Sequence, residues 1–238
     1  MLVPEAFFDH EEVRRINEHV FGVKHRTSET SGHIHAMRNY LKGRLYEFIE
    51  KFDIDIIIPQ NVLSIPMHIP LGLAVTELIA ETGIPTIAHH HDFHWERLRF
   101  SLNAAQDYLQ MAFPPKLPSI QHVVISSLAQ EELALRTGIS ATVIPNVLDF
   151  ENESQVDLEY SKNFRQEIGL EEGDVLILQP TRIVQRKGIE HAIELVSQLG
   201  DPKYKLVISA SVMVLVCMAL KVNEDHARDH NVDLKLVS

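Results

Sequence analysis

The sequence predicts an α/β protein with parallel β-sheets, organised as two domains. Short apolar runs rich in β-branched residues recur between longer stretches with helical spacing, and strands that alternate with helices form parallel sheets covered on both faces. The alternation is interrupted once, by a polar stretch between Pro145 and Asn163. With 238 residues, of which 45% are hydrophobic and 23% charged, the chain is long enough for two small domains.

Six runs are predicted to be buried strands because they are apolar, β-branched and too short for helices. They are Asp53–Pro59, Ile84–His89, His122–Ser126, Ala141–Pro145, Val175–Pro180 and Tyr204–Ser209. Amphipathic stretches that end at Phe52 and Leu199 are predicted to be helices. Ser126 follows a strand and is predicted to cap the next helix rather than to act as a nucleophile, because no G-x-S-x-G motif accompanies it.

The acidic and amide-rich stretch from Pro145 to Asn163 predicts an interdomain linker. The first domain is then expected to span residues 1–148 and the second 149–238. The first domain opens on a loop and a helix, where an α/β nucleotide fold normally opens on a strand and a Gly-rich turn, and the second has few strands. We therefore expect the first domain to lack its opening strand and the second to be partial. An unfinished sheet edge favours association with another chain.

Composition excludes several classes of protein. A formal net charge of −11 argues against a general nucleic-acid binder. The single cysteine, Cys217, excludes an internal disulfide, and the basic-then-apolar pattern of a signal peptide is absent, so we expect a cytoplasmic protein. The least polar segment, Leu206–Leu220, is shorter than the roughly 18 to 20 residues of a membrane span. The dinucleotide and P-loop glycine motifs are also absent.

The stretch LILQPTRIVQRKGIEHAIEL combines a strand end with several cations. The strand is predicted to end at Pro180 and the helix to begin near Lys187, which leaves Arg182, Arg186 and Lys187 in the connecting loop and first helical turn. Ligands of open α/β sheets bind outside the carboxyl ends of the strands, and helix N-termini favour anions. A cation at that position opposes the helix dipole unless an anion neutralises it. The pattern favours a phosphate site over solvated loop charges.

A second polar cluster, PTIAHHHDFHWER, follows another predicted strand. It places His89, His90, His91 and Asp92 at the strand end and His94 shortly after. Histidines can ligate metals, but adjacent residues of an extended chain point to opposite faces, so a metal would need ligands from elsewhere. A polar substrate site, a structural histidine cluster and a metal site all remain open, and we expect no metal.

Trp95, Arg97 and Arg99 follow the histidines and suggest a second binding surface. Stacking on the indole ring and hydrogen bonds from the guanidinium groups suit an anionic or sugar-like ligand. The same residues also fit a helix face with a packed aromatic side chain. Both interpretations are open on the sequence.

Three motifs in order resemble the retaining glycosyltransferases of family 4, which have the GT-B fold. These are IPTIAHHHDFHWER, VIPNVLDF and LILQPTRIVQRKGIEHAIELV, and the resemblance runs from about Asp53 to the end of the chain. It implies two Rossmann-like domains facing each other across a cleft, with the acceptor on the first and the nucleotide sugar on the second. The implied reaction transfers a hexose from a nucleotide-diphosphate sugar to a sugar or small-molecule acceptor, on the same face, without a covalent enzyme intermediate or cofactor.

The resemblance also implies roles for individual residues. Arg182 and Lys187 match the family's Arg and Lys that hold the donor diphosphate and stabilise it as it leaves, with Arg186 beside them. The histidine that contacts the transferred sugar is His90 or His91, with Asp92 next to it. Trp95, Arg97 and Arg99 would lie on the acceptor side, and Asn146 at the domain junction.

The sequence departs from the family at both ends. The opening Gly-rich turn is absent before Met1, and a later motif with two glutamates seven residues apart is also absent. We therefore expect weak or no turnover. One alternative is a non-catalytic truncated relative that binds nucleotide sugar or a partner chain. Another is a metal-dependent hydrolase that uses residues between His89 and His94.

Overall fold

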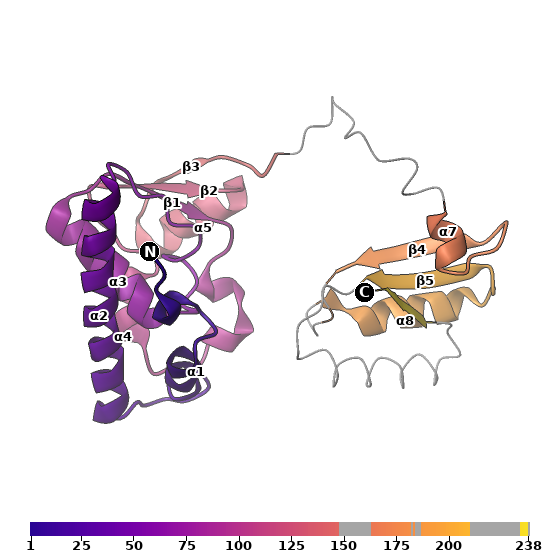
Figure 1. Cartoon of the computed structure of the whole chain (residues 1–238), viewed down its shortest axis with the longest axis horizontal. Coiled ribbons are helices and arrows are strands. Elements are labelled where there is room, and N and C mark those ends of the chain that lie inside the picture. Colours follow the sequence, from indigo (N-terminus) through magenta and orange to yellow (C-terminus); the bar gives the residue numbers. More distant parts are fainter. Residues whose placement is uncertain (148–162, 182, 184–186, 210–233, 238) are drawn as a thin grey trace. The chain divides into compact units, whose positions relative to one another are not determined.

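A computed structural model describes residues 1–147, 163–181, 183, 187–209 and 234–237. Contacts divide the chain into two units, Met1–Leu148 and Asp149–Ser238 (Figure 1). Each unit contains a three-stranded sheet in which neighbouring strands are parallel. The α/β class with parallel sheets is therefore confirmed.

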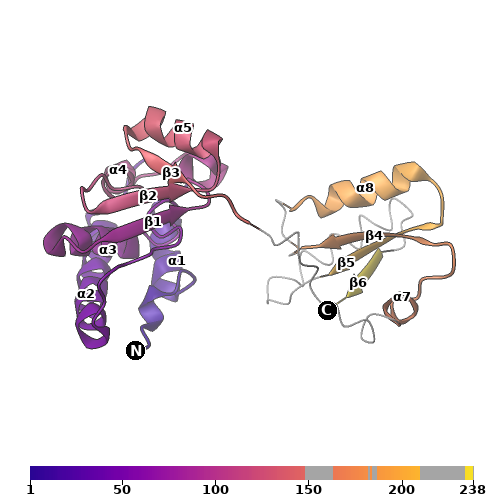
Figure 2. The same ribbon diagram turned by 90° about the horizontal axis from the view of Figure 1, so that it is seen from above.

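The first unit alternates helices and strands. Its elements in order are α1 (Glu11–Glu18), α2 (Ser28–Phe52), α3 (Ile69–Thr82), β1 (Thr86–His90), α4 (Gln106–Ala112), β2 (Ile120–Val124), α5 (Ser127–Thr137) and β3 (Ala141–Val143). The strand order is β1-β2-β3, with His90 opposite Val124 and Val124 opposite Val143. Figure 2 shows α5 on one side of this sheet and α2 and α3 on the other.

The predicted strand Asp53–Pro59 is wrong as a continuous strand. Only isolated bridges join this segment to β1, at Ile57 and Gln60. Ile57 N–H donates to Pro85 O at 3.0 Å, and His89 N–H donates to Pro59 O at 3.1 Å. Pro59 has no N–H to return, which interrupts the ladder. The segment nevertheless runs parallel to β1 and brings residues 60 and 61 to the end of that strand.

Local signals fix the ends of the helices. His68 caps α3, because its Nδ1 accepts the Leu71 N–H at 3.2 Å, and Gly83 ends the helix with φ of 67°. Ser126 Oγ accepts the Ala129 N–H at 3.2 Å, which confirms the predicted cap of α5. Gly72 of α3 lies against Phe113, where an added Cβ would be 2.2 Å from the ring, so only glycine fits this approach.

Three hydrophobic clusters form the core of the first unit. One joins α1, α2, α3 and α4 through side chains such as Leu41, Leu73 and Leu109. A second lies between α3 and β1 and includes Ile79 and Ala88. The third joins β2 to α5 and to the segment after β1, and its buried members are Phe93, Val124, Leu133 and Ile139.

The second unit has a smaller described core. Its elements are α7 (Phe164–Glu167), β4 (Val175–Pro180), α8 (Ile189–Leu199), β5 (Tyr204–Ser209) and β6 (Leu234–Val237). The strand order is β4-β5-β6, and α8 lies along one face of the sheet (Figure 2). Ile189 and Ile193 of α8 pack in one cluster with Leu206 and Ile208 of β5.

No helix within the described ranges is long and apolar enough to cross a bilayer. Of the apolar segment Leu206–Leu220, residues 206–209 belong to β5, and 210–220 lie outside the described residues.

Candidate functional site

Polar side chains gather at the carboxyl end of β1. His91 and Asp92 follow β1 directly, and Gln60 and Asn61 end the segment that runs beside it. Asn61 N–H donates to His89 O at 3.0 Å, and Asn61 Oδ1 accepts the His91 N–H at 2.7 Å. Parallel sheets bind ligands at this edge.

Asn61 has a left-handed backbone, with φ of 59°. Asparagine tolerates this conformation better than most residues with a Cβ atom. Such backbone conformations persist where surrounding bonds determine them, and they are frequent at ligand sites. Here the two hydrogen bonds to the end of β1 hold Asn61 in place.

A cavity of about 430 Å³ opens beside these residues. Arg97 and the amides of Gln60 and Asn61 form its polar part. The other lining residues are Ala6, Phe7, Phe8, Val62, Ile65, Met67, His68 and Leu71. A mostly apolar wall with a few polar groups is typical of small-molecule sites.

Two exposed aromatic residues line the cavity. Phe7 and Phe8 are 51% and 52% exposed, and their ring centroids are 4.8 Å apart. His68 ties this N-terminal segment to α3, because its Nε2 lies 2.8 Å from Glu5 O while its Nδ1 accepts from α3. Burial lowers the pKa of His68, so the imidazole stays neutral, with Nε2 as the donor and Nδ1 as the acceptor.

The structure separates the two histidines that the sequence left as alternatives. His90 is only 1% exposed, and its Nε2 is 2.9 Å from Nδ1 of His122 on β2. Burial, followed by the neighbouring His122, lowers the pKa of His90 to about 3. His91 is partly exposed, and its Nε2 lies 3.2 Å from Gln60 Oε1. Of the two, His91 is the one that a ligand can reach in this unit.

The histidine cluster does not assemble a metal site. Within the ranges that the structure describes, no three His, Cys, Asp or Glu side chains are placed to hold a metal ion. His89 contacts the ring of His91 at 4.5 Å, while His90 pairs with His122. The metal-dependent hydrolase alternative therefore has no ligand set in the described part of the chain.

The three predicted acceptor-side residues do not share one cavity. Arg97 lines the cavity and pairs with Asp92, whose Oδ2 accepts the Arg97 Nε–H at 2.6 Å. Trp95 stacks on Phe93, with centroids 4.4 Å apart and planes at 9°. Arg99 lies over the Phe100 ring at 4.8 Å. The packed-aromatic interpretation thus describes Trp95, whereas Arg97 is available to a ligand.

In the second unit the structure describes one of the three predicted phosphate-binding cations. Lys187 is exposed, and its carbonyl oxygen accepts a hydrogen bond from Gln179 Nε2 at 2.9 Å. Arg182 and Arg186 lie outside the described residues. Helix α8 follows Gly188, which has φ of 60° and provides no side-chain cap. The first N–H groups of α8 and the Lys187 ammonium group therefore lie next to each other in the chain.

The polar residue at the predicted domain junction, Asn146, is exposed. It lies two positions before Leu148, the last residue of the first unit. Its proposed place near a cleft stays a prediction.

Sequence patterns did not predict a role for Phe7, Phe8, Gln60, Asn61 and Gln179. The sequence does contain a signal for the two amides. Gln60 and Asn61 directly follow an apolar run, as the histidines do. Gln179 Oε1 is buried without a hydrogen-bond partner in the described ranges. Phe7 and Phe8 had no local signal, since they reach the cavity through a contact between Glu5 and His68.

Comparisons with known proteins agree with this fold. No family model matches the chain. The crystal structure of Anabaena HepE in complex with UDP and glucose matches with a TM-score of 0.55 at 14% identity, over 87% of this chain and 50% of that one. Sucrose-phosphate synthase from Thermosynechococcus elongatus matches with a TM-score of 0.59 at 15% identity, over 86% and 50%. The chain is thus similar in fold to GT-B glycosyltransferases.

Two enzymes named mannosylglucosylglycerate synthase are similar in sequence. The one from Petrotoga mobilis is 38% identical over 175 residues, which is 72% of this chain and 40% of that protein. The one from Thermotoga maritima is 34% identical over 209 residues, which is 84% of this chain and 47% of that protein. The chain spans less than half the length of these relatives.

Proposed function

We propose that this chain forms part of a family 4 retaining glycosyltransferase that transfers a hexose from a nucleotide-diphosphate sugar to an acceptor. The observation that carries the proposal is the 34% identity to the Thermotoga maritima enzyme. The match covers 84% of the chain, more than the first unit's 148 residues, so it includes parts of both units. The GT-B-like fold supports the same class of activity.

In this proposal the second unit binds the donor. Lys187, with Arg182 and Arg186, neutralises the diphosphate, and the uncapped first turn of α8 adds N–H donors. Cleavage of the bond between the sugar and the phosphate leaves negative charge on the nucleotide oxygens. Fixed positive groups act most strongly where such charge develops. Gln179 supports Lys187 through its hydrogen bond to the Lys187 carbonyl.

The first unit binds the acceptor in the cavity beside β1. Phe7 and Phe8 offer apolar faces to the carbon side of a sugar ring, and the amides of Gln60 and Asn61 bond its hydroxyls. His91 and Asp92, at the end of β1, contact the transferred sugar. Asp92 neutralises Arg97 through their ion pair, which leaves the cavity suited to the uncharged part of an acceptor.

The relatives' name suggests the substrates. It describes a product with mannosyl, glucosyl and glycerate parts. By this similarity, the proposed donor is a nucleotide-diphosphate mannose and the proposed acceptor is glucosylglycerate.

Calorimetry with the full chain tests donor binding. We expect saturable binding of one of GDP-mannose, UDP-glucose or ADP-glucose, and Lys187→Ala should weaken it about tenfold, because a charge-assisted contact to phosphate is lost. Lys203→Ala is the matched control. Lys203 pairs with Asp201 at 2.9 Å and precedes β5, at the sheet edge opposite to the end of β4.

Several outcomes would contradict the proposal. Absence of binding to all three donors would contradict the proposed donor site. Equal losses of donor affinity in the two lysine variants would also contradict it. If the donor binds, mass spectrometry of the products with glucosylglycerate then tests transfer. Binding without any transfer would favour a non-catalytic relative.

A further inference from the structure

The first unit has a second cavity. It has a volume of about 350 Å³ and lies between α4, the loop that follows it and the end of α5. It shares no lining residue with the cavity beside Asn61. Its lining residues are His94, Trp95, Gln106, Leu109, Gln110, Phe113, Pro114, Lys116, Arg136, Thr137 and Ile139.

The lining of this cavity is positively charged, in contrast to the chain as a whole. Lys116 and Arg136 both line it, and among the described residues no Asp or Glu does, although the chain carries a formal net charge of −11. Neither cation has an ion pair with a carboxylate in the described ranges. Glu132, which does not line the cavity, accepts the Trp95 Nε1–H at 3.0 Å.

Both cations lie at the C-terminal end of α5. Arg136 is in its last turn and lies over the Trp95 ring at 5.4 Å. Lys116 approaches Gly138, where an added Cβ would be 3.5 Å from Nζ. The negative end of the helix dipole favours positive charge here. A negatively charged group between Lys116 and Arg136 would be attracted by both side chains.

We propose that this cavity binds a small organic anion that carries a phosphate or carboxylate group on a short carbon skeleton. Lys116 and Arg136 bind the anionic group. The side-chain amides of Gln106 and Gln110 supply hydrogen bonds, and Leu109, Phe113 and Ile139 form the apolar wall against the carbon skeleton. The site is additional to the proposed donor and acceptor sites.

Trp95 makes this site directly observable. It is the only tryptophan in the chain and lines the cavity. The full chain is titrated with glycerol 3-phosphate, inorganic phosphate and glycerate, with glycerol as the neutral match. We expect a saturable change in Trp95 emission with the anions and none with glycerol. The ranking of the phosphates and glycerate identifies which anionic group the site prefers.

Lys116→Ala is the informative variant, because removing Arg136 from above the indole ring would alter the emission by itself. It should weaken anion binding about tenfold, whereas Lys24→Ala, at an exposed site outside the cavity, should not. Lys187→Ala should leave the Trp95 response intact, which separates this site from the donor site. Circular dichroism checks that each variant folds.

Three results would overturn the inference. They are no saturable emission change with any anion, an equal response to glycerol, and equal affinities of Lys116→Ala and Lys24→Ala. In each case Lys116 and Arg136 would only stabilise the end of α5.

Discussion

His90 and His122 lie on neighbouring strands and hold each other in a buried, uncharged state. Both are almost fully buried, and burial lowers the pKa of His122 to about 4 and that of His90 to about 3. His90 Nδ1 has no hydrogen-bond partner in the described ranges. A charged imidazole at either position would lack water and a carboxylate partner. The stability of the first unit should therefore depend on pH.

Stability should fall as the pH drops below about 6.5. The unfolded histidines bind protons from about this pH, while the folded ones stay neutral until about pH 4 and 3. Protonation therefore stabilises the unfolded state relative to the folded state as the pH falls. We expect a loss of about 2 kcal/mol per histidine by pH 5. Urea unfolding of the full chain between pH 7.5 and 5 measures it.

His122→Asn provides the comparison for this prediction. Asparagine keeps a polar side chain but does not titrate, so the loss of stability by pH 5 should shrink by the contribution of one histidine, about 2 kcal/mol. His25→Asn is the control at an exposed position. An unchanged slope in His122→Asn would show that other groups cause the acid sensitivity.

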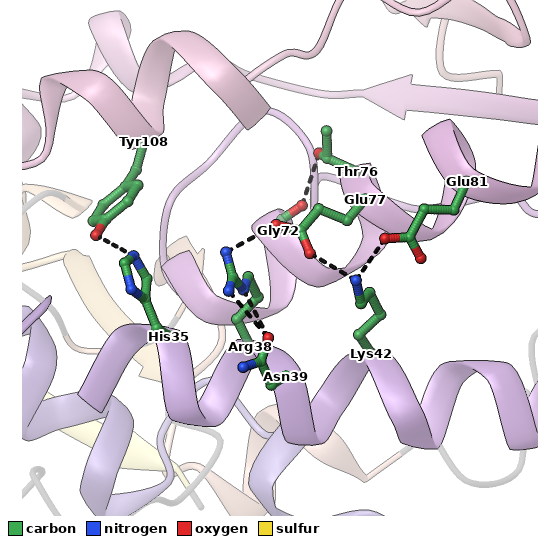
Figure 3. Close-up of polar contacts among 9 residues, drawn as sticks. All are labelled: His35, Arg38, Asn39, Lys42, Gly72, Thr76, Glu77, Glu81 and Tyr108. Atoms are coloured by element: carbon green, nitrogen blue, oxygen red, sulfur yellow. Dashed lines mark hydrogen bonds and ion pairs between the residues drawn. The ribbon is translucent and has the colours of Figure 1, made fainter. Parts of the chain in front are cut away.

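At the scale of the elements, an ion-pair network fastens α2 to α3 (Figure 3). Glu77 of α3 accepts from Arg38 Nη1 at 2.9 Å and from Lys42 Nζ at 3.1 Å. Lys42 also reaches Glu81 at 2.6 Å. The Arg38, Lys42 and Glu77 side chains are 18–23% exposed, so solvent screens these pairs less than ordinary surface pairs. The network joins α2 to α3 in addition to the core contact between Leu41 and Leu73.

Glu77→Gln should lower the free energy of unfolding by about 1–2 kcal/mol, because it leaves two half-buried cations with fewer partners. The control is Glu47→Gln, which removes the exposed Arg44–Glu47 pair within α2. That change should cost less than about 0.5 kcal/mol. Urea unfolding at low and high salt measures both. Equal effects in the two variants would mean that the network adds no more than a surface pair.

At the scale of the whole molecule, the described core clusters do not cross between the two units. Three clusters contain residues of the first unit alone, and one contains residues of the second. Domains with their own cores can fold separately. The first unit therefore carries its sheet and the two cavities described above without residues of the second.

A chain that ends at residue 147 should fold by itself. We expect cooperative thermal unfolding of this shortened chain, with the same Trp95 emission as the full chain, because Trp95 contacts Phe93, Glu132 and Arg136, which all belong to the first unit. Calorimetry and fluorescence measure these properties. Non-cooperative unfolding or a shifted emission would show that the first unit needs residues beyond 147.

Sequence patterns predicted the elements better than the site. The strands Val175–Pro180 and Tyr204–Ser209 and the helix end at Phe52 are confirmed at the predicted residues, because apolar period and length report burial directly. The strand Asp53–Pro59 is not continuous, because Pro59 has no N–H and interrupts the hydrogen bonds to β1. The segment with His91 and Arg97 was proposed from residue types in one local run, and its role stays a prediction. Phe7 and Phe8 were not, because their position depends on a hydrogen bond between residues 63 positions apart.

The strand order has a consequence for biosynthesis. In both sheets the described strands are neighbours in the order in which the ribosome makes them. Each strand after the first therefore emerges when the edge it will join already exists. Apart from the first strand of each sheet, no described strand has to wait, unpaired, for a partner that is translated later, which limits the time during which an open edge can capture another nascent chain.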